Sequence, residues 1–182
     1  MTLFEALANV KDPRRKQGQR LNKEQLLAII ILANLCGHFG GRGIARFGKV
    51  HSETLSTGLK LKHKIPSHVT ISGFINRVDE GEMKYAFNKW AGNYVPIEEG
   101  KFVSGDGKAL GSTVSDCHGS NQDFQAVVSL FIQESGLVYA IESYRNSKKS
   151  EIGIVRFLLD KLKGMGLTIF LDALHTQKKL QK

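Results

Sequence analysis

Two short apolar segments of the sequence each end on an aspartate that small or polar residues follow. The first is 101-KFVSGDGKAL-110, with Asp106, and the second is 168-TIFLDALHTQ-177, with Asp172. Short apolar runs bounded by glycine or polar residues are typical of strands. Carboxylates at the ends of neighbouring strands can share a divalent cation such as Mg²⁺. The alternative is that each acid merely belongs to a turn, since Gly-Asp-Gly tolerates turn conformations.

The strands that would position these acids follow from a period-two pattern in the second half of the chain. A short strand is expected over 101–106. Apolar and other residues alternate in 124-FQAVVSLFIQ-133, and Ser135-Gly136 then forms a tight turn into 137-LVYAIESYR-145. We therefore expect the second and third strands to form a hairpin.

A helix and a further strand complete this half of the chain. The helix is expected over 147–164 and the last strand over 167–172. The inner face of this helix is expected to carry Ile152, Val155, Leu159 and Leu162. A helical crossover joins parallel strands, so the first and last strands should run in the same direction. If they are neighbours, the strand spacing of about 4.8 Å brings Asp106 and Asp172 together at one edge.

The first half of the chain has the patterns of helices. Thr2, Asn22 and Ser67 are expected to cap the N-termini of three of them. The strongly apolar helix over 23–36 is expected to form the core of this region. Further helices are expected over 39–50, over 52–59, and on the apolar stripes within 71–78 and 83–94. The whole chain is thus expected to be of the α/β (α+β) class, with a helical domain (1–98) and a strand-containing domain (99–182).

Composition points to a soluble protein with a polyanionic partner. The 182 residues carry a net charge of +9 and a pI near 9.6, which favours nucleic acid over an anionic membrane. A basic protein without such a partner is the alternative. The apolar run 26–36 is about half the roughly 20 residues needed to span a bilayer. We therefore expect a cytoplasmic protein with no membrane and no small-molecule substrate.

Two basic segments, 14-RRKQGQR-20 and 60-KLKHK-64, are the candidates for contacts with phosphate groups. Solvated surface loops of the same composition are the alternative. A helix-turn-helix around 66–78 has no turn signature to support it. The candidate DNA-binding residues are Arg14, Arg15, Lys16, Arg20, Lys60, Lys62 and Lys64.

The sequence resembles the DDE transposases of bacterial insertion sequences, in particular the H-repeat-associated proteins. The resemblance covers nearly the whole chain, and its most specific part is the pair GDGK and DALHTQ, whose aspartates are 66 residues apart. The segments that carry it are, in order, 12-DPRRKQGQ-19, 34-NLCG-37, 66-PSHVT-70, 105-GDGKALGS-112 and 171-LDALHTQ-177.

This resemblance implies an RNase H-like catalytic domain behind a helical region. It makes Asp106 and Asp172 the first two catalytic acids, which would hold two Mg²⁺ or Mn²⁺ ions for attack on a phosphodiester. His175 and Lys108 take supporting roles near the metals. The implied partners are DNA (transposon ends and target) and further copies of the chain in a homo-oligomer.

The sequence departs from the family pattern in one respect. The third family acid is a glutamate on a helix downstream of the second aspartate, yet no acidic residue follows Asp172, and Glu142 and Glu151 lie upstream. We therefore expect a C-terminally truncated transposase whose RNase H-like domain is incomplete (strand-strand-strand-helix-strand) and which cannot cut DNA alone. Two alternatives remain: a DNA-binding remnant that acts as a binding or dimerisation module, and a basic α/β domain whose aspartates are structural.

Overall fold

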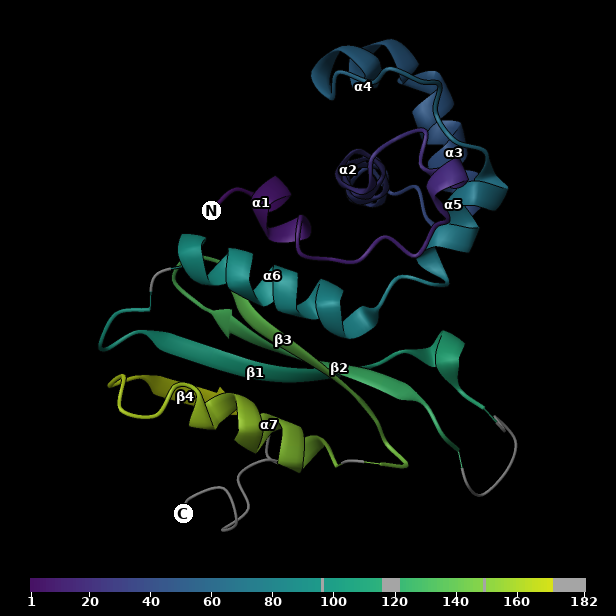
Figure 1. Ribbon diagram of the computed structural model, residues 1–182. Coiled ribbons are helices and arrows are strands. Elements are labelled where there is room, and N and C mark those ends of the chain that lie inside the picture. The colour runs from purple at the N-terminus through teal and green to yellow at the C-terminus, as the bar shows by residue number, and fades with distance from the viewer. Residues whose placement is uncertain (96, 116–121, 149, 172–182) are drawn as a thin grey trace. The chain divides into compact units, whose positions relative to one another are not determined.

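The computed structural model describes residues 1–95, 97–115, 122–148 and 150–171, and Figure 1 shows their elements. The chain divides into two compact units, Met1–Ala86 and Phe87–Lys182, which we describe separately. The boundary lies within helix α6 (Glu80–Tyr94), whereas the sequence suggested a boundary after residue 98. A helical unit is thus followed by an α/β unit, and the predicted fold class is confirmed.

The first unit is built from helices whose starts follow the sequence pattern. The side chains of Thr2, Asn22 and Ser67 each accept a hydrogen bond from the backbone N–H three residues further on, so the three predicted caps are confirmed. Its elements are α1 (Leu3–Leu7), the 3-10 helix η1 (Lys16–Gly18), α2 (Lys23–Leu35), α3 (Gly40–Val50), α4 (Ser52–Gly58), α5 (His68–Ile75) and the first part of α6.

Helix α2 provides the core of this unit, as its apolar sequence predicted. Leu26, Ile29 and Ala33 are fully buried, and they belong to one apolar cluster with Ile44 of α3 and Phe74 of α5. Burial of an aliphatic side chain of this size contributes roughly 1.5–3 kcal/mol. This cluster therefore fixes α3 and α5 against α2 and leaves their outer faces to solvent.

Two glycines allow α3 to lie close to α5 and to the segment before it. A Cβ on Gly41 would overlap the Ser72 hydroxyl and come within 2.8 Å of the His68 carbonyl oxygen. A Cβ on Gly48 would come within 2.6 Å of a methyl carbon of Ile65. Distances below 3 Å are far shorter than a carbon contact tolerates. Glycine at these two positions is therefore required by the close approach of α3 to its neighbours.

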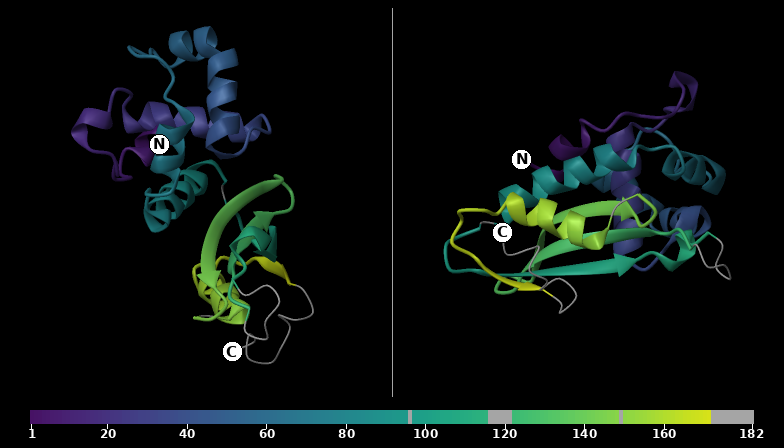
Figure 2. Two further views of the ribbon diagram at one scale, coloured as in Figure 1. Left: turned by 90° about the vertical axis from the view of Figure 1, so that its right-hand side faces the viewer. Right: turned by 90° about the horizontal axis from the view of Figure 1, so that it is seen from below.

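The second unit is a four-stranded mixed sheet with the order β3-β2-β1-β4. The strands are β1 (Phe102–Ala109), β2 (Gln125–Ile132), β3 (Leu137–Arg145) and β4 (Thr168–Leu171). The β2–β3 hairpin is antiparallel, and β4 pairs with β1 in parallel, as predicted. Helix α7 (Glu151–Asp160) crosses one face of the sheet (Figure 2). Its Ile154, Val155 and Leu158 are buried against residues of β1, β2 and β3.

The crossover helix is shorter than predicted and turned relative to its expected face. It begins after Ser150, whose side chain accepts a hydrogen bond from the N–H of Gly153, and not at residue 147. Its last turn ends before Gly164, which has a positive φ of 82°. Of the predicted inner face, Val155 and Leu162 are buried, whereas Ile152 and Leu159 are only partly buried and Ile154 and Leu158 are buried in their place. The cap sets the start of the helix, and the face that packs on the sheet carries Ile154, Val155 and Leu158.

A side chain from α6 covers part of the outer edge of the sheet. The amide group of Asn88 donates to the carbonyl oxygen of Ile141 at 2.9 Å and accepts from its N–H at 2.8 Å. These are the two hydrogen bonds that a neighbouring strand would make with β3 at this position. The amide thus occupies an edge position that would otherwise be open to another strand.

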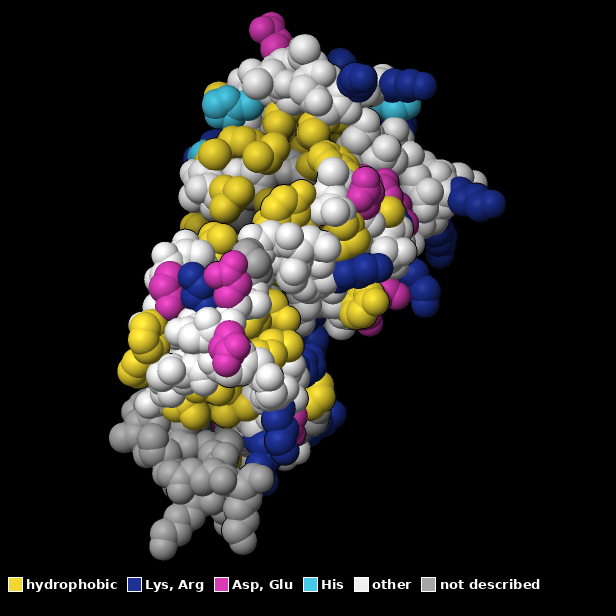
Figure 3. All heavy atoms as spheres, turned by 90° about the vertical axis from the view of Figure 1, so that its left-hand side faces the viewer, with side chains coloured by type: hydrophobic (Ala, Val, Ile, Leu, Met, Phe, Trp, Pro, Cys, Tyr) yellow, Lys and Arg dark blue, Asp and Glu magenta, His cyan; other side chains and the backbone are white. Residues whose placement is uncertain are grey.

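Hydrophobic side chains reach the surface of both units between charged ones (Figure 3), and the largest exposed fractions are those of Leu35 (79%) and Phe39 (72%). Within the described part of the chain, no single helix is long and apolar enough to cross a membrane. One bent pair, α2 with α3, passes that test by length and composition, with an angle of 97° between the two helices.

The close approach at Gly41 generates a prediction about stability. Gly41→Ala should lower the free energy of unfolding by about 1–3 kcal/mol, because the added methyl group overpacks the α3–α5 contact. Gly58→Ala in α4 is the control, since nothing lies within 4 Å of its Cβ position, and it should be neutral or stabilising by about 0.5–1 kcal/mol. Urea unfolding measures both. Equal stability of the two variants would contradict the packing described for α3.

Candidate active site and nucleic-acid interface

Asp106 lies in the middle of the sheet, on its central strand β1. This strand pairs with β2 from Val103 to Ala109, so Asp106 is three residues from its end and not at it. The prediction that β1 stops at Asp106 is therefore wrong, and so is the alternative that Gly-Asp-Gly forms a turn. Pairing with β2 continues through both glycines because the adjacent strand supplies their hydrogen bonds.

Strand alternation places the Asp106 side chain on the face opposite α7. Val103 and Gly105 face the core with α7, whereas Asp106 and Lys108 point the other way and are exposed. On that face the residue paired with Asp106 across β2 is Ser129. Asp106 has no ion pair among the described residues, so its carboxylate oxygens are available to a ligand.

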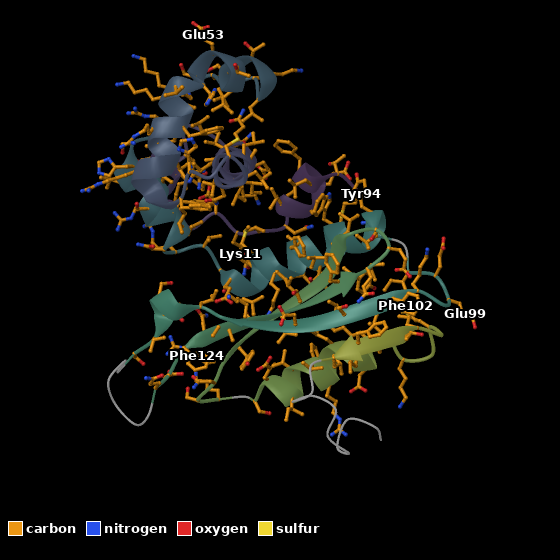
Figure 4. All side chains as sticks on the ribbon, turned by 180° about the vertical axis from the view of Figure 1, so that it is seen from behind. Lys11, Glu53, Tyr94, Glu99, Phe102 and Phe124 are labelled. Carbon is orange, nitrogen blue, oxygen red and sulfur yellow. The ribbon has the colours of Figure 1, made fainter. Side chains whose placement is uncertain are left out.

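The face that carries Asp106 also retains exposed aromatic side chains. Phe102, Phe131 and Phe170 are 42%, 37% and 48% exposed. The rings of Phe102 and Phe170 lie 5.6 Å apart, so the first residue of β1 contacts β4 through an aromatic pair. Phe102 lies at the opposite end of the sheet from Phe124, which precedes β2 (Figure 4). Asp106 thus lies beyond the aromatic pair, toward the C-terminal end of β1.

The two glycines beside Asp106 leave room for side chains on the α7 face. A Cβ on Gly105 would come within 2.8 Å of a methyl carbon of Leu171, and one on Gly107 would overlap the carboxylate of Glu151. Burial raises the pKa of Tyr144, and the charge of Glu151 and a hydrogen bond to it raise this pKa further. Glu151 therefore supports β1 from the face opposite Asp106. The sequence analysis set Glu151 aside, although its spacing of three and four residues from Ile154 and Val155 places it on the inner stripe of α7.

The parallel pairing of β1 with β4 has a fixed register. Phe102 pairs with Thr168 and Gly105 with Leu171, an offset of 66 residues throughout. Asp172 and His175 follow immediately but lie outside the described residues. No group of three His, Cys, Asp or Glu side chains that could hold a metal ion occurs in the described residues.

The two predicted basic segments come together in the first unit. Residues of both line one hollow of about 700 Å³, which we call the loop groove. Its lining residues are Arg14, Gln17, Gly18, Arg20, Leu21, His63, Lys64, Ile65, Pro66, Ser67 and Thr70. All the predicted DNA-binding residues except Arg14 are exposed, so their ammonium and guanidinium groups can reach a polyanion. The sequence could not show that the two segments are neighbours.

Arg14 has a different role from the one predicted. Its side chain is only 4% exposed and forms a bidentate pair with Asp12. It also donates to the Leu21 carbonyl oxygen at 2.9 Å, and its guanidinium lies 5.5 Å from the centre of the Phe74 ring. These contacts use the donors that a phosphate would need. Arg14 therefore organises the 12–21 loop, and its guanidinium donors are engaged within the protein.

The pKa of Asp12 reflects this pair. Partial burial pushes its pKa upward, but hydrogen bonds and the charge of Arg14 outweigh burial and hold the pKa below the ordinary 3.8. A lowered folded-state pKa stabilises the protein above the unfolded value, and this contribution is lost as the pH falls through the folded value. The Asp12–Arg14 pair is therefore complete at neutral pH.

Positive charge is concentrated in the helical unit. Residues 1–86 contain 14 Lys and Arg against 7 Asp and Glu, which gives +7 of the chain's +9. The α/β unit carries the remaining +2 together with Asp106. The charge that attracts a polyanion and the acids that could hold a metal thus belong to different units.

Comparison with known proteins shows which proteins the chain is similar to. Residues 4–91 match the family described as DDE_Tnp_1-associated. Over 95% of its length the chain is 27% identical to an uncharacterised protein of the dhlA 3′ region of Xanthobacter autotrophicus. Over 99% of its length it is 24% and 26% identical to YhhI and YbfD of Escherichia coli strain K12, each of which is named "H repeat-associated putative transposase".

These matches confirm the resemblance drawn from the sequence. The chain is similar to transposases of the DDE/H-repeat family. It spans 58% of the length of the Xanthobacter relative, 48% of YhhI and 72% of YbfD, so it covers about half to three quarters of the proteins it matches.

The structural role of Arg14 can be tested against its exposed neighbour. Arg14→Met should lower the free energy of unfolding by about 3 kcal/mol, because it leaves the Asp12 carboxylate half-buried without its partner. Arg15→Met removes the same charge from an exposed position and should change stability by less than about 0.5 kcal/mol. Thermal unfolding at pH 7 measures both variants. Two equal, small effects would show that Arg14 does not organise the loop.

Proposed function

We propose that the chain acts in DNA transposition, with Asp106 and Asp172 as two carboxylate ligands of a divalent-cation site. The observation that carries this proposal is the 66-residue offset of the β1–β4 register. Asp106 and Asp172 are separated by the same 66 residues. If the pairing continues by one residue beyond Leu171, the two aspartates become direct neighbours, about 4.8 Å apart.

The donor set fits Mg²⁺ or Mn²⁺. Both cations take oxygen ligands, and carboxylates at adjacent strand positions supply them from one side of the sheet. The cations, when bound, activate the attacking hydroxyl and stabilise the leaving oxygen of a phosphodiester. The chain's own residues would hold the site: Asp106 pairs with Ser129 of β2, β4 pairs with β1 up to Gly105, and the Glu151 side chain lies against β1 on the opposite face. Lys108, exposed on the same face as Asp106, is placed to approach a phosphate.

The strand order also agrees with the RNase H-like domain that the family resemblance implies. An antiparallel β1–β2–β3 meander followed by a helix and a parallel β4 has the order strand-strand-strand-helix-strand. Residues 173–182 contain no acid. We therefore propose that these 182 residues bind metal and DNA, and that strand cleavage and transfer need a third carboxylate from outside them.

A DNA-binding module without catalysis is the second candidate. It is favoured by the concentration of charge in residues 1–86, where the exposed basic loops meet. Both candidates share DNA as the partner and differ only in whether the α/β unit binds metal. The DNA in either case is the transposon end and its target, with a homo-oligomer as the form that pairs two ends.

Mn²⁺ binding by the complete chain separates the two candidates. Removal of a side chain that only hydrogen-bonds to a metal ligand lowers metal affinity by about 10–100-fold. Removal of two ligand charges in Asp106→Asn/Asp172→Asn should therefore weaken Mn²⁺ binding by at least about tenfold. The control is Glu53→Gln/Asp160→Asn, which changes the charge equally at two exposed acids. Isothermal titration calorimetry measures all three proteins.

The outcome decides which candidate stands. Binding that is weakened only in the Asp106/Asp172 variant supports a shared metal site. If Mn²⁺ binding is absent or equal in all three proteins, the DNA-binding module without catalysis is the candidate that remains. Cleavage of DNA by the 182 residues with Mn²⁺ alone would contradict the proposed need for a third carboxylate.

A further inference from the structure

Helix α3 carries a basic stripe that the sequence analysis did not single out. Arg42, Arg46 and Lys49 are spaced by four and three residues, so they lie along one face of the helix. All three are exposed, whereas Ile44 and Phe47 on the opposite face are buried in the core of the unit. We call these three residues the α3 stripe.

No acid of the described residues lies within ion-pair distance of this stripe, although Glu53 lines the same hollow as Lys49. Helix α3 contains no Asp or Glu, and none of the three side chains has an ion pair among the described residues. By contrast, Lys11 and Arg14 of the same unit each lie within 4.0 Å of a carboxylate oxygen. Three unpaired cations on one helix face repel one another. A polyanionic partner would reduce this repulsion, which is already present in the free protein.

The stripe is continuous with the loop groove. Arg42 and His68 line one hollow of about 670 Å³, and Lys49, His68 and Lys64 line another of about 960 Å³. Lys64 also lines the loop groove together with Arg20. Nitrogen-tipped side chains project outward from this part of the unit (Figure 4). The start of α5 and the segment before it thus connect Arg42 and Arg20 in one surface. Gly41 and Gly48 allow these residues to lie close to α3.

We propose that the α3 stripe and the loop groove form one docking surface for the phosphate backbone of duplex DNA. The proposal rests on the proposed function, because it takes DNA as the partner. Arg42 and Lys49 are separated by about 10 Å along the helix axis. Duplex DNA carries about six phosphate charges over that length. The stripe contacts phosphates, so it contributes affinity and orientation without reading the base sequence.

The test compares two triple variants of the complete chain that remove the same charge. Arg42→Ala/Arg46→Ala/Lys49→Ala removes the stripe and keeps helix propensity, since alanine is the best helix former. Lys148→Ala/Lys161→Ala/Lys163→Ala removes three exposed lysines of the α/β unit. Each protein is titrated with a 30-base-pair duplex of arbitrary sequence at several salt concentrations, and circular dichroism checks that its helix content is unchanged.

The expected result is a loss of salt dependence that is confined to the stripe variant. Each lost phosphate contact lowers the slope of log K against log salt by about 0.9, so the stripe variant should lose about 2–3 units of slope. The control should keep the wild-type slope. A duplex of different sequence should change the affinities of the wild type and of both variants by the same factor.

Other outcomes overturn the proposal in distinguishable ways. If the wild-type chain does not bind duplex DNA, the proposed function fails together with this surface. If the wild type binds and both variants lose equal slope, net charge governs binding and only the surface fails. If the stripe variant loses affinity for vesicles of anionic phospholipid while its DNA affinity is unchanged, the partner is a membrane surface and the proposal is wrong.

Discussion

The parallel pairing of β1 with β4 is the constraint on which the candidate active site depends. Antiparallel neighbours come from adjacent parts of a chain through a short turn, but β4 reaches β1 only after a helix has crossed the sheet. The buried stripe of α7 packs this connecting helix against β1, β2 and β3, and β4 then pairs with β1 from Phe102 to Gly105. The absence of side chains at Gly105 and Gly107 then lets Leu171 and Glu151 approach the strand. Packing on the α7 face thus affects the position of the strand that carries Asp106 on its opposite face.

The sequence predicted much of this fold because local signals agreed with tertiary ones. Caps at Thr2, Asn22 and Ser67, the alternation over β2, and the glycine turn before β3 each act over a few residues. The direction of β4 followed from the crossover rule. The start of α7 was missed because both Ser147 and Ser150 are of a residue type that can cap a helix, and it is Ser150 whose side chain accepts from the N–H of Gly153. The length of β1 was missed because its glycines are weak strand formers that β2 nevertheless pairs.

The candidate binding residues show a different limit of sequence reasoning. Arg14 and Arg15 are neighbours of the same type, yet one is buried in a network with Asp12 and the other faces solvent. Composition cannot separate them, because the difference lies in which side chain meets Phe74 and the Leu21 carbonyl. Arg42, Arg46 and Lys49 were overlooked for the converse reason. They are spread over eight positions of a helix and form no run in the sequence, although the helix aligns them.

The contact of Asn88 with Ile141 determines how this sheet can be extended. Because an amide side chain already fills the middle of the β3 edge, a strand added there would first have to displace it. No described residue blocks the outer edge of β4 in this way. Within the described residues, protection against pairing with another strand is therefore confined to the β3 edge of the sheet.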